Sequence, residues 1–401
     1  MPAGVAGQLY AEDGRTFFGD WFTHGGWSLL IEPYAGYQHL VPRVTSWTIM
    51  SVFPAQWWAT ATNLAACSIV GAVAGLVFFF SRDVTSFWPS RVALGLLTAV
   101  APIVGFEALG NLANLHWFLL YLSIWVLLAI PRSVIGAWGM GAVALLCTAT
   151  EPQCAMFLPL AVWAVVRSRR SRPVVLCWTV GVVAQVVTTL IAPREIADHY
   201  PPLLSTVEGY VLNVGMTLGS LHPGVLGPVL ARTSWWIGSI GVLLVFAVAV
   251  LGAVWGERRE RVAITALLYG SIVSWTASFV LGANPIFFYS EMTPEQLGEP
   301  LLIRWGTAAG LMLGATLFVA IGVVARRRPD WRRGAFAAIG LIVIVMAANL
   351  VWTEPAASDD WERSVDEAAA TCTDNPDAVR DVATPPGPDW VVPLPCSVLK
   401  E

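Results

Sequence analysis

The chain has 401 residues, of which 56% are hydrophobic and only 12% charged, and its mean hydropathy is +0.65. So little polar surface excludes an ordinary soluble protein and predicts a multi-spanning integral membrane protein. The net charge of −4 says little by itself, but Lys400 is the only lysine, and Arg-rich, Lys-poor usage is typical of a high-GC bacterial source.

The first notable segment is 10–18, in which Glu12 and Asp13 stand side by side among aromatic residues. As a structural feature, Asp13 caps a short helix and Gly14 permits a tight turn. In the alternative interpretation, a carboxylate beside apolar groups loses hydration, which disfavours its charge, and it then accepts a proton from a hydroxyl. These residues alone leave both interpretations open.

Residues 15–56 are rich in Trp, Gly and Pro and also carry polar side chains. Such a mixture favours short helices at the bilayer boundary, where Trp and Tyr have one apolar and one hydrated end. We therefore expect residues 1–56 to form an outer acidic loop with interfacial helices.

Ten apolar runs follow and predict an all-α, polytopic transmembrane bundle over residues 57–352. A run near twenty residues spans about 30 Å of hydrocarbon, whereas the shorter runs, 92–106 and the three between 117 and 166, are also compatible with broken or re-entrant helices. The runs are 57–80, 92–106, 117–130, 134–149, 154–166, 173–192, 236–255, 262–282, 304–324 and 335–352.

The arginines predict the orientation, because basic residues favour cytoplasmic loops. With Asp13 outside, fifteen of the 23 basic residues but only four of the 27 acids fall in the inner loops. These inner loops are 81–91, 131–133, 167–172, 257–261 and 326–333. We expect a multi-pass protein of the bacterial plasma membrane whose site faces the extracytoplasmic side.

The start of the chain has no cleavable signal peptide, since residues 1–9 have neither a basic nor an apolar region. If the N-terminus is outside and no apolar run precedes it, residues 1–56 would have to cross the membrane without a leading helix. We therefore expect a first transmembrane helix to precede this sequence, which would give eleven spans.

Residues 353–401 form a separate polar tail with two cysteines, Cys372 and Cys396. In an oxidising compartment these two thiols are expected to form a disulfide. The other four cysteines lie in or beside apolar runs, where thiols act as small packing residues. The sequence contains no CxxC or HExxH spacing that would indicate a metal site.

Polar side chains interrupt the apolar runs on the predicted outer face, at Glu107, Asn114, His116, Trp117 and Glu151. They are compatible with a capped helical hairpin. They are equally compatible with a cavity wall that hydrogen-bonds sugar hydroxyls, with Trp117 as a stacking surface. A carboxylate this close to the membrane is a functional candidate by default, although Glu151 also has the simpler option of reaching water at a loop.

Arg304 opens a span on the predicted outer side, where the charge rule disfavours an idle arginine. It either extends to lipid headgroups or clamps a phosphate, which a planar guanidinium binds well. Arg43 and His39 are weaker candidates of the same kind.

The arrangement of an acidic pair on the first outer loop, interfacial helices, about ten spans and an outer tail resembles the GT-C superfamily of membrane glycosyltransferases. More narrowly, it resembles a little-characterised actinobacterial branch of that superfamily. The superfamily has a transmembrane helix before its first acidic loop, which is missing here. The motifs that carry the narrower resemblance are Ala11-Glu12-Asp13-Gly14, Pro33-Tyr34-Ala35-Gly36-Tyr37 with Pro42-Arg43, and Asn114-Leu115-His116-Trp117.

The resemblance implies transfer of a sugar from a polyprenyl-phosphate donor to a cell-envelope glycan or lipid-linked acceptor. Asp13 would be the general base, worth about 10²–10⁴-fold in rate, and Glu12 would orient the acceptor or hold a cation. Arg304, with Arg43, would stabilise the departing phosphate. No Asp-x-Asp metal motif is present, so a divalent cation is only an option.

Other functions remain open at this stage. A ligase or polymerase of lipid-linked oligosaccharides would share a large outer loop such as 193–235. A polysaccharide or lipid flippase would also have about ten spans, although it should show a repeat between its halves. A non-catalytic scaffold should tolerate Asp13→Asn. Nucleic-acid binding is not supported, because the basic clusters are short loops that topology explains.

Overall fold

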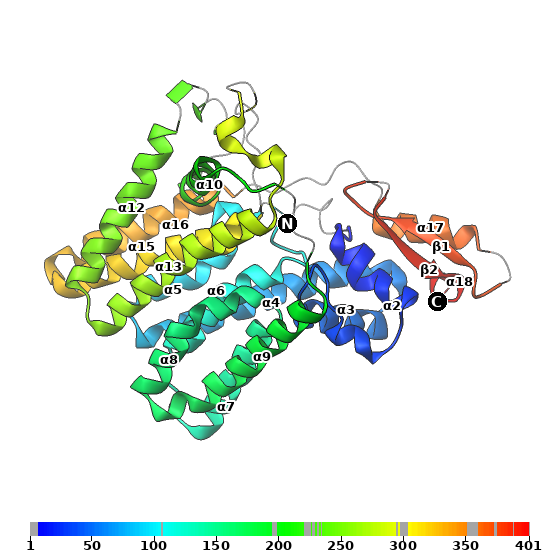
Figure 1. The fold of residues 1–401 in the computed structure, drawn as a ribbon, viewed down its shortest axis with the longest axis horizontal. Coiled ribbons are helices and arrows are strands. Elements are labelled where there is room, and N and C mark those ends of the chain that lie inside the picture. The colour runs from blue at the N-terminus through cyan, green and yellow to red at the C-terminus, as the bar shows by residue number, and fades with distance from the viewer. Residues whose placement is uncertain are drawn as a thin grey trace.

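The computed structural model describes residues 7–105, 107–194, 199–219, 226, 229–230, 232–233, 235–293, 296, 304–350, 360–372, 375–387 and 389–400. In this part of the chain the fold is an all-α bundle with one small antiparallel sheet near the C-terminus (Figure 1). The predicted fold class is therefore confirmed.

The N-terminal region contains the short helices that its composition predicts. They are η1 (Asp13–Phe18), α2 (Gly19–Thr23), η2 (Trp27–Ile31) and α3 (Leu40–Val52). The first of them, η1, is a π-helical turn, a rare conformation that often marks functional sites. Their position at a membrane boundary stays a prediction.

All ten predicted apolar runs are helices, and in the described part seven helical segments are long and apolar enough to cross a membrane. The three shorter ones are α6, α7 and α8, within the region where the sequence already suggested short or broken helices. The ten helices are α4 (Trp58–Phe80), α5 (Trp88–Val100), α6 (Leu115–Leu128), α7 (Val134–Thr148), α8 (Leu158–Arg167), α9 (Arg172–Ile191), α12 (Trp236–Trp255), α13 (Arg258–Leu281), α15 (Gly306–Arg327) and α16 (Arg332–Ala348).

Short helical turns join these helices. They are η3 (Ala55–Trp57), η4 (Ser81–Asp83), η5 (Pro102–Gly105), η6 (Pro152–Phe157), η7 (Arg169–Ser171), η9 (Pro285–Phe287), η10 (Tyr289–Glu291) and η11 (Pro329–Trp331).

The 193–235 region is more than the loop that the sequence suggested. It contains α10 (Leu203–Tyr210) and η8 (Val211–Met216), which pack against α12, α13 and α15. The Trp275 indole donates to the Thr206 carbonyl oxygen at 2.8 Å, and the Tyr210 and Ser271 hydroxyls are 2.9 Å apart. Polar residues such as Asn213 interrupt the apolar pattern of this segment, so hydropathy alone does not detect it.

Two helices, α6 and α15, form the centre of the bundle. Every residue of α6 is buried, and so are most residues of α15. By contrast, α9, α12 and α16 expose large apolar side chains such as Leu190, Leu243 and Ile344. A helix buried on all sides belongs to a protein core, while the exposed apolar faces suit lipid.

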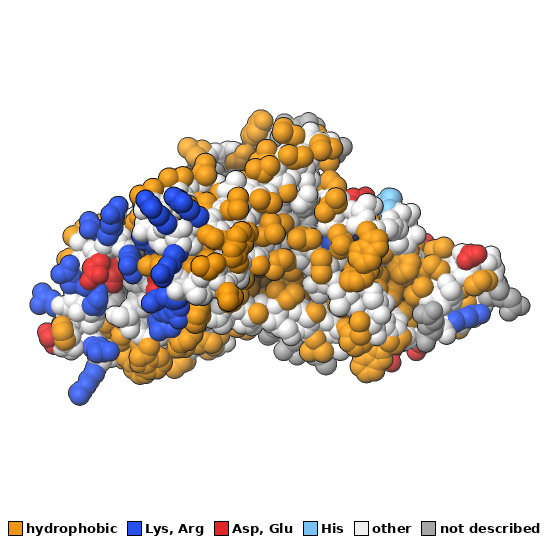
Figure 2. Space-filling view, turned by 90° about the horizontal axis from the view of Figure 1, so that it is seen from below, with side chains coloured by type: hydrophobic (Ala, Val, Ile, Leu, Met, Phe, Trp, Pro, Cys, Tyr) orange, Lys and Arg blue, Asp and Glu red, His pale blue; other side chains and the backbone are white. Residues whose placement is uncertain are grey.

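The arginine-rich turns lie together at one end of the bundle, which we call the basic end. Arg132 pairs with Asp83 at 2.7 Å, Arg167 donates to the Leu128 carbonyl oxygen at 2.8 Å, and Arg326 pairs with Glu257 at 2.9 Å. Figure 2 shows most of the Arg and Lys side chains of that face gathered at this end, beside a broad hydrophobic surface. The arginines that the sequence assigned to the inner loops therefore lie together at one end of the folded bundle.

The C-terminal tail is a folded unit, the C-terminal module. It comprises α17 (Trp361–Ala370), β1 (Val379–Ala383), β2 (Val391–Pro395) and α18 (Cys396–Leu399). The strands pair in antiparallel register from Val379 opposite Pro395 to Ala383 opposite Val391. The predicted Cys372–Cys396 disulfide is present. The predicted boundary at 352/353 lies outside the described residues.

The module is not a separate appendage. Figure 1 shows it beside the N-terminal helices, and α2 and η1 pack against β2. The first and last parts of the described chain therefore form one assembly.

Candidate active site

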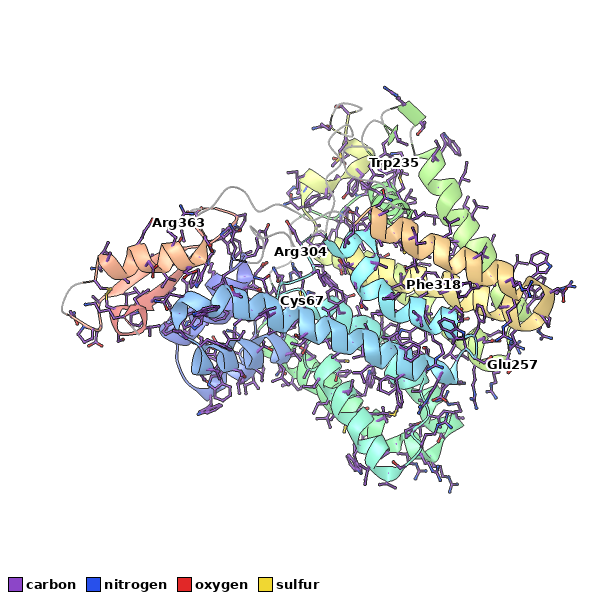
Figure 3. All side chains as sticks on the ribbon, turned by 180° about the vertical axis from the view of Figure 1, so that it is seen from behind. Cys67, Trp235, Glu257, Arg304, Phe318 and Arg363 are labelled. Carbon is purple, nitrogen blue, oxygen red and sulfur yellow. A yellow bond between two sulfur atoms is a disulfide. The ribbon has the colours of Figure 1, made fainter. Side chains whose placement is uncertain are left out.

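The candidate site lies where the N-terminal segment meets the beginnings of α6 and α15. Asp13 contacts the turn before α6, and Glu12 contacts Arg304, two residues before α15. Figure 3 shows Arg304 and Glu257 near opposite ends of α15, so the site lies at the end away from the basic turns. We call this the acidic end.

Asp13 is almost completely buried, with 1% of its surface exposed. Its Oδ2 accepts the N–H of Leu112 and its Oδ1 accepts the N–H of Ala113, both at 2.8 Å. Burial raises the pKa of Asp13 to about 7, although these two hydrogen bonds oppose the rise. The carboxyl group therefore changes its charge near neutral pH, as a general base requires.

The capping role considered for Asp13 is realised, but across the fold. Its oxygens cap the amides that precede α6, about 100 positions along the chain, rather than amides of its own helix. The structural and functional interpretations of Asp13 are thus compatible, because a hydrogen-bonded carboxylate retains lone pairs.

Arg304 bridges two carboxylates. Its Nη2 lies 2.6 Å from Oε1 of Glu12, and its Nη1 lies 3.5 Å from Oε2 of Glu107. The Tyr10 hydroxyl donates to Oε1 of Glu107 at 3.1 Å. Burial acts to lower the pKa of Arg304, but the two carboxylates outweigh it and the pKa is raised. The guanidinium is therefore held as a fixed cation at the site.

Backbone strain is concentrated at the same place. Ala11 has φ of +48° and Glu107 has φ of +58°, a left-handed conformation that residues other than glycine rarely adopt. Both residues adjoin the carboxylate and guanidinium groups described above. Strain of this kind often accompanies functional sites.

The turn before α6 is stiffened by its two asparagines. The Asn114 side-chain amide donates to the Glu107 carbonyl oxygen at 2.7 Å, and the Asn114 N–H donates to Oδ1 of Asn111 at 3.2 Å. Asn114 thus supports the loop that presents Glu107 and the Asp13-bound amides. In the structure, the Asn114 side chain therefore hydrogen-bonds to the backbone of this loop.

His116, the second residue of α6, forms a buried pair with Glu151, which immediately precedes η6. The His116 Nδ1 contacts Oε2 of Glu151, while Oε1 of Glu151 accepts the Gln153 N–H at 2.8 Å. Only 1% of Glu151 is exposed, so it does not reach water at a loop. Glu151 is therefore enclosed by the protein.

Aromatic rings surround this pair. His39 lies 4.2 Å from the Tyr37 ring and 5.9 Å from the His116 ring, and Trp117 lies 3.9 Å from the His116 ring, all between centroids. Burial lowers the pKa of His39 well below its usual value, and nearby His116 and Arg43 add to this, so His39 is neutral at pH 7. Trp117 is 5% exposed and presents no open stacking surface in this state.

Arg43 is placed differently from the sequence-based expectation. Its guanidinium pairs with Asp20 at 2.8 Å, donates to the Thr16 carbonyl oxygen at 3.2 Å and is 1% exposed. The Phe17 ring also covers it at 5.3 Å. The structure therefore gives Arg43 the task of holding η1 against α3, and we do not retain it as a phosphate ligand.

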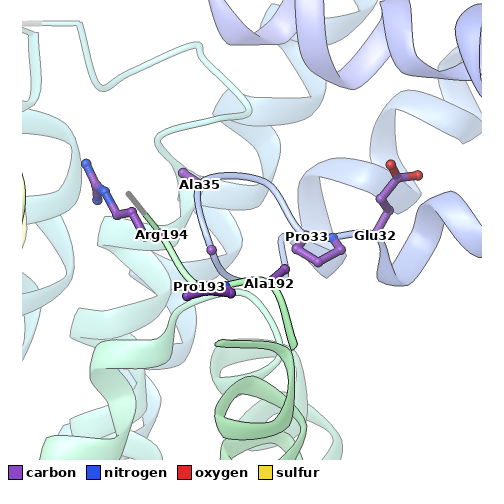
Figure 4. A pocket seen from close by; sticks show the side chains of 7 residues that line it. Glu32, Pro33, Ala35, Ala192, Pro193 and Arg194 are labelled. Carbon is purple, nitrogen blue, oxygen red and sulfur yellow. The ribbon is translucent and has the colours of Figure 1, made fainter. Parts of the chain in front are cut away.

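A groove of about 560 Å³ opens beside the aromatic cluster. Figure 4 shows Arg194 on one side and Glu32 on the other. Gly36, with φ of +86°, is required here because a Cβ atom would lie 2.8 Å from the Arg194 backbone nitrogen. The groove is lined by Glu32, Pro33, Ala35, Gly36, Ala192, Pro193 and Arg194.

No protein-family model matches the chain, and comparison with curated proteins and with solved structures found no significant similarity. The functional argument therefore depends on the chemistry of the site.

The described residues contain no group of three or more His, Cys, Asp and Glu side chains placed to hold a metal ion. Between Glu12 and Glu107 the positive charge comes from Arg304 instead.

The structure brings Glu12, Glu107 and Arg304 into one cluster, with Asp13 next to Glu12, and it adds two residues that the sequence did not single out, Tyr10 and Asp20. Tyr10 bonds to Glu107, and Asp20 neutralises Arg43. Tyr10 opens the acidic segment and was a possible signal. Asp20 has no distinguishing sequence context.

Proposed function

We propose that this protein is a membrane glycosyltransferase that moves a sugar from a polyprenyl-phosphate donor to a cell-envelope glycan or lipid-linked acceptor. The reaction takes place at the acidic end, on the extracytoplasmic side of a bacterial plasma membrane. The observation that carries the proposal is the buried Asp13 carboxyl group, with its pKa near 7, beside the Arg304 guanidinium.

In the proposed reaction, Asp13 removes the proton of the acceptor hydroxyl as its oxygen attacks the anomeric carbon. The bond between that carbon and the lipid-phosphate oxygen breaks, and the phosphate leaves with the electron pair. Asp13 is closed from solvent in the present state, so the residues that cover it must move to admit the acceptor.

Arg304 supplies the positive charge for the departing phosphate. In the absence of donor its charge is balanced by Glu12 and Glu107, and a phosphate would compete with these two carboxylates for the same donors. A guanidinium that is already positioned costs little reorganisation during the reaction. Glu12, released from Arg304, is then available to orient the acceptor.

The groove and the aromatic cluster suit a polar acceptor. Residues 32–39 contribute to both, and the groove has Glu32 and Arg194 at its sides. A sugar ring has apolar C–H faces and a polar rim of hydroxyl groups. It therefore packs against aromatic side chains while its hydroxyls hydrogen-bond to neighbouring polar groups.

The orientation is supported by the basic end. Five turns with fifteen of the 23 basic residues lie away from Asp13, as the positive-inside preference favours for cytoplasmic turns. The acidic end is then extracytoplasmic, where the Cys372–Cys396 disulfide is stable.

The test compares Asp13→Asn with Asp83→Asn. Asp83 is a matched control, because it is also buried and its carboxylate accepts a backbone N–H, from Ile130 at 2.8 Å, but at the basic end. Transfer from a polyprenyl-phosphate sugar should fall about 10²–10⁴-fold in Asp13→Asn and remain near wild type in Asp83→Asn.

Thermal unfolding of both variants separates catalysis from folding, since each loses one acceptor for a buried amide. Comparable melting temperatures with unequal activity support Asp13 as the base. Full transfer activity in a folded Asp13→Asn protein would remove that assignment.

A further inference from the structure

The C-terminal module holds the backbone of the acidic turn directly. The N–H of Ala11 donates to the Pro385 carbonyl oxygen at 2.7 Å. Ala11 is the residue with φ of +48°, it is 3% exposed, and it immediately precedes Glu12. The module therefore satisfies a buried amide at a residue with left-handed backbone conformation.

Gly14 provides a second contact on the same side. A Cβ atom at Gly14 would lie 2.8 Å from Cγ2 of Thr384, closer than real Cβ atoms approach, and 3.1 Å from Cγ2 of Val392, which is tighter than most real contacts. Gly14 is therefore needed for the approach of η1 to the module, and not only for a turn. The Arg15 guanidinium lies over the Trp390 ring of the module at 5.4 Å.

The module is itself anchored on both sides of this contact. The N–H of Trp361 donates to the Gly7 carbonyl oxygen at 3.0 Å, and its indole donates to the Ala55 carbonyl oxygen at 2.7 Å. The Trp361 ring also stacks on Trp58, the first residue of α4, at 6.5 Å. Residues 7–14 thus lie between α4 and the β-strands of the module.

The disulfide joins these two contact regions. Cys372 follows α17, which carries Trp361, and Cys396 follows β2, which carries Val392. The bond therefore links the part of the module that is anchored on α4 to the part that packs on Gly14.

We propose that the disulfide-bonded C-terminal module is a positioning element of the site, which fixes the Ala11–Gly14 turn so that Asp13 meets the Leu112 and Ala113 amides and Glu12 meets Arg304. Its consequence for catalysis rests on the function proposed above. Its structural part does not, because the contacts of Asp13 and Glu12 are present whatever the reaction.

The test measures hydrogen exchange in the full-length protein, in segments 8–18 and 107–114. Two variants weaken the module contact, Gly14→Ala and the Cys372→Ser/Cys396→Ser pair, and Thr384→Ser combined with Gly14→Ala is the rescue variant. The matched control is Gly75→Ala on α4, where nothing lies within 4 Å of the added Cβ.

We expect exchange in both segments to rise at least about tenfold in Gly14→Ala and in the double serine variant, with no change in α6 or in Gly75→Ala. Thr384→Ser should partly restore protection to Gly14→Ala, because it removes the nearest methyl group. Wild-type exchange in both segments of the double serine variant and of Gly14→Ala would overturn the proposal. Should Gly14→Ala not fold, reduction of the wild-type disulfide supplies the same comparison.

Transfer activity gives a second, separate measurement. A positioning role predicts that the double serine variant has a lower kcat and a donor KM that is little changed. The donor KM is preserved because Arg304, the proposed ligand of the donor phosphate, belongs to the helical bundle and not to the module. If no transfer is found in the wild-type protein, the proposed function fails, while the exchange result still decides the role of the module.

Discussion

Arg304 and Arg326 lie near the two ends of α15, and each of them bridges two carboxylates. Arg304 joins Glu12 and Glu107 at the acidic end, and Arg326 joins Glu257 and Glu260 at the basic end. The same pairing thus occurs at both ends of one helix, once at the candidate site and once at the basic turns. This duplication provides a natural internal control.

The two arginines should respond differently to removal. Arg304→Ala should lower kcat/KM for a polyprenyl-phosphate donor about 10²–10³-fold, as is typical for loss of a donor that stabilises developing negative charge. Arg326→Ala, which leaves two carboxylates in the same way, should keep near-wild-type kinetics. Steady-state assays in detergent or nanodiscs check this, and equal losses in both variants would assign Arg304 a purely structural role.

The pH dependence of activity should follow Asp13. Because burial raises the pKa of this group to about 7, the ionised base becomes available only as the pH rises through that value. Transfer should therefore be half-maximal near pH 7 and lost at lower pH. A profile that is flat from pH 5 to about pH 8 would exclude Asp13 as the titrating base.

Stability should show the opposite trend. The folded protein binds the Asp13 proton more tightly than the unfolded chain, whose carboxyl has the ordinary value of 3.8. The contribution of Asp13 to stability is thus present at low pH and is lost as the pH rises from about 4 through about 7. The melting temperature of Asp13→Asn minus that of wild type should accordingly increase with pH over this window.

Asp20→Asn tests whether Arg43 is structural. The substitution leaves a buried guanidinium with the Thr16 carbonyl oxygen and without its carboxylate, which should cost about 3 kcal/mol of unfolding free energy. Replacing Arg43 by Met in the same protein should recover part of this loss, because the uncompensated charge is removed. If instead Asp20→Asn is stable and Arg43→Met raises the donor KM, the phosphate role of Arg43 returns.

The orientation is open to direct labelling. In a background without the four free cysteines, His24→Cys at the acidic end and Arg328→Cys at the basic end both place a thiol at an exposed position. A membrane-impermeant maleimide added to intact cells should label the first and not the second. The reverse pattern would place the site in the cytoplasm and remove the lipid-linked outer-face chemistry.

Much of the fold was predictable, because hydropathy and charge act over short stretches. Each of the ten apolar runs became a helix, and the arginine turns lie at one end. The Cys372–Cys396 disulfide followed from the two thiols outside the apolar runs. The helices α10 and η8 escaped detection, since polar residues break their pattern.

For the site, the sequence predicted several of the residues but not the contacts that they make. The partners of Asp13 are backbone amides at 112 and 113, and no side-chain pattern identifies an amide donor. Gly14 reads as a turn residue in sequence, whereas its function in the fold is to admit Thr384, which lies 370 positions away. The pairing of Arg43 with Asp20 likewise depends on how α2 packs relative to α3.

The enclosure of α6 has a consequence for biogenesis. This helix has fourteen residues, too few to span a bilayer easily, and none of them faces lipid. It is therefore stabilised in its final position only when the neighbouring helices pack around it. The amides that receive Asp13 are therefore delivered late, as the bundle assembles. In an unassembled chain the Asp13 carboxylate would lack the Leu112 and Ala113 amides that bind it here.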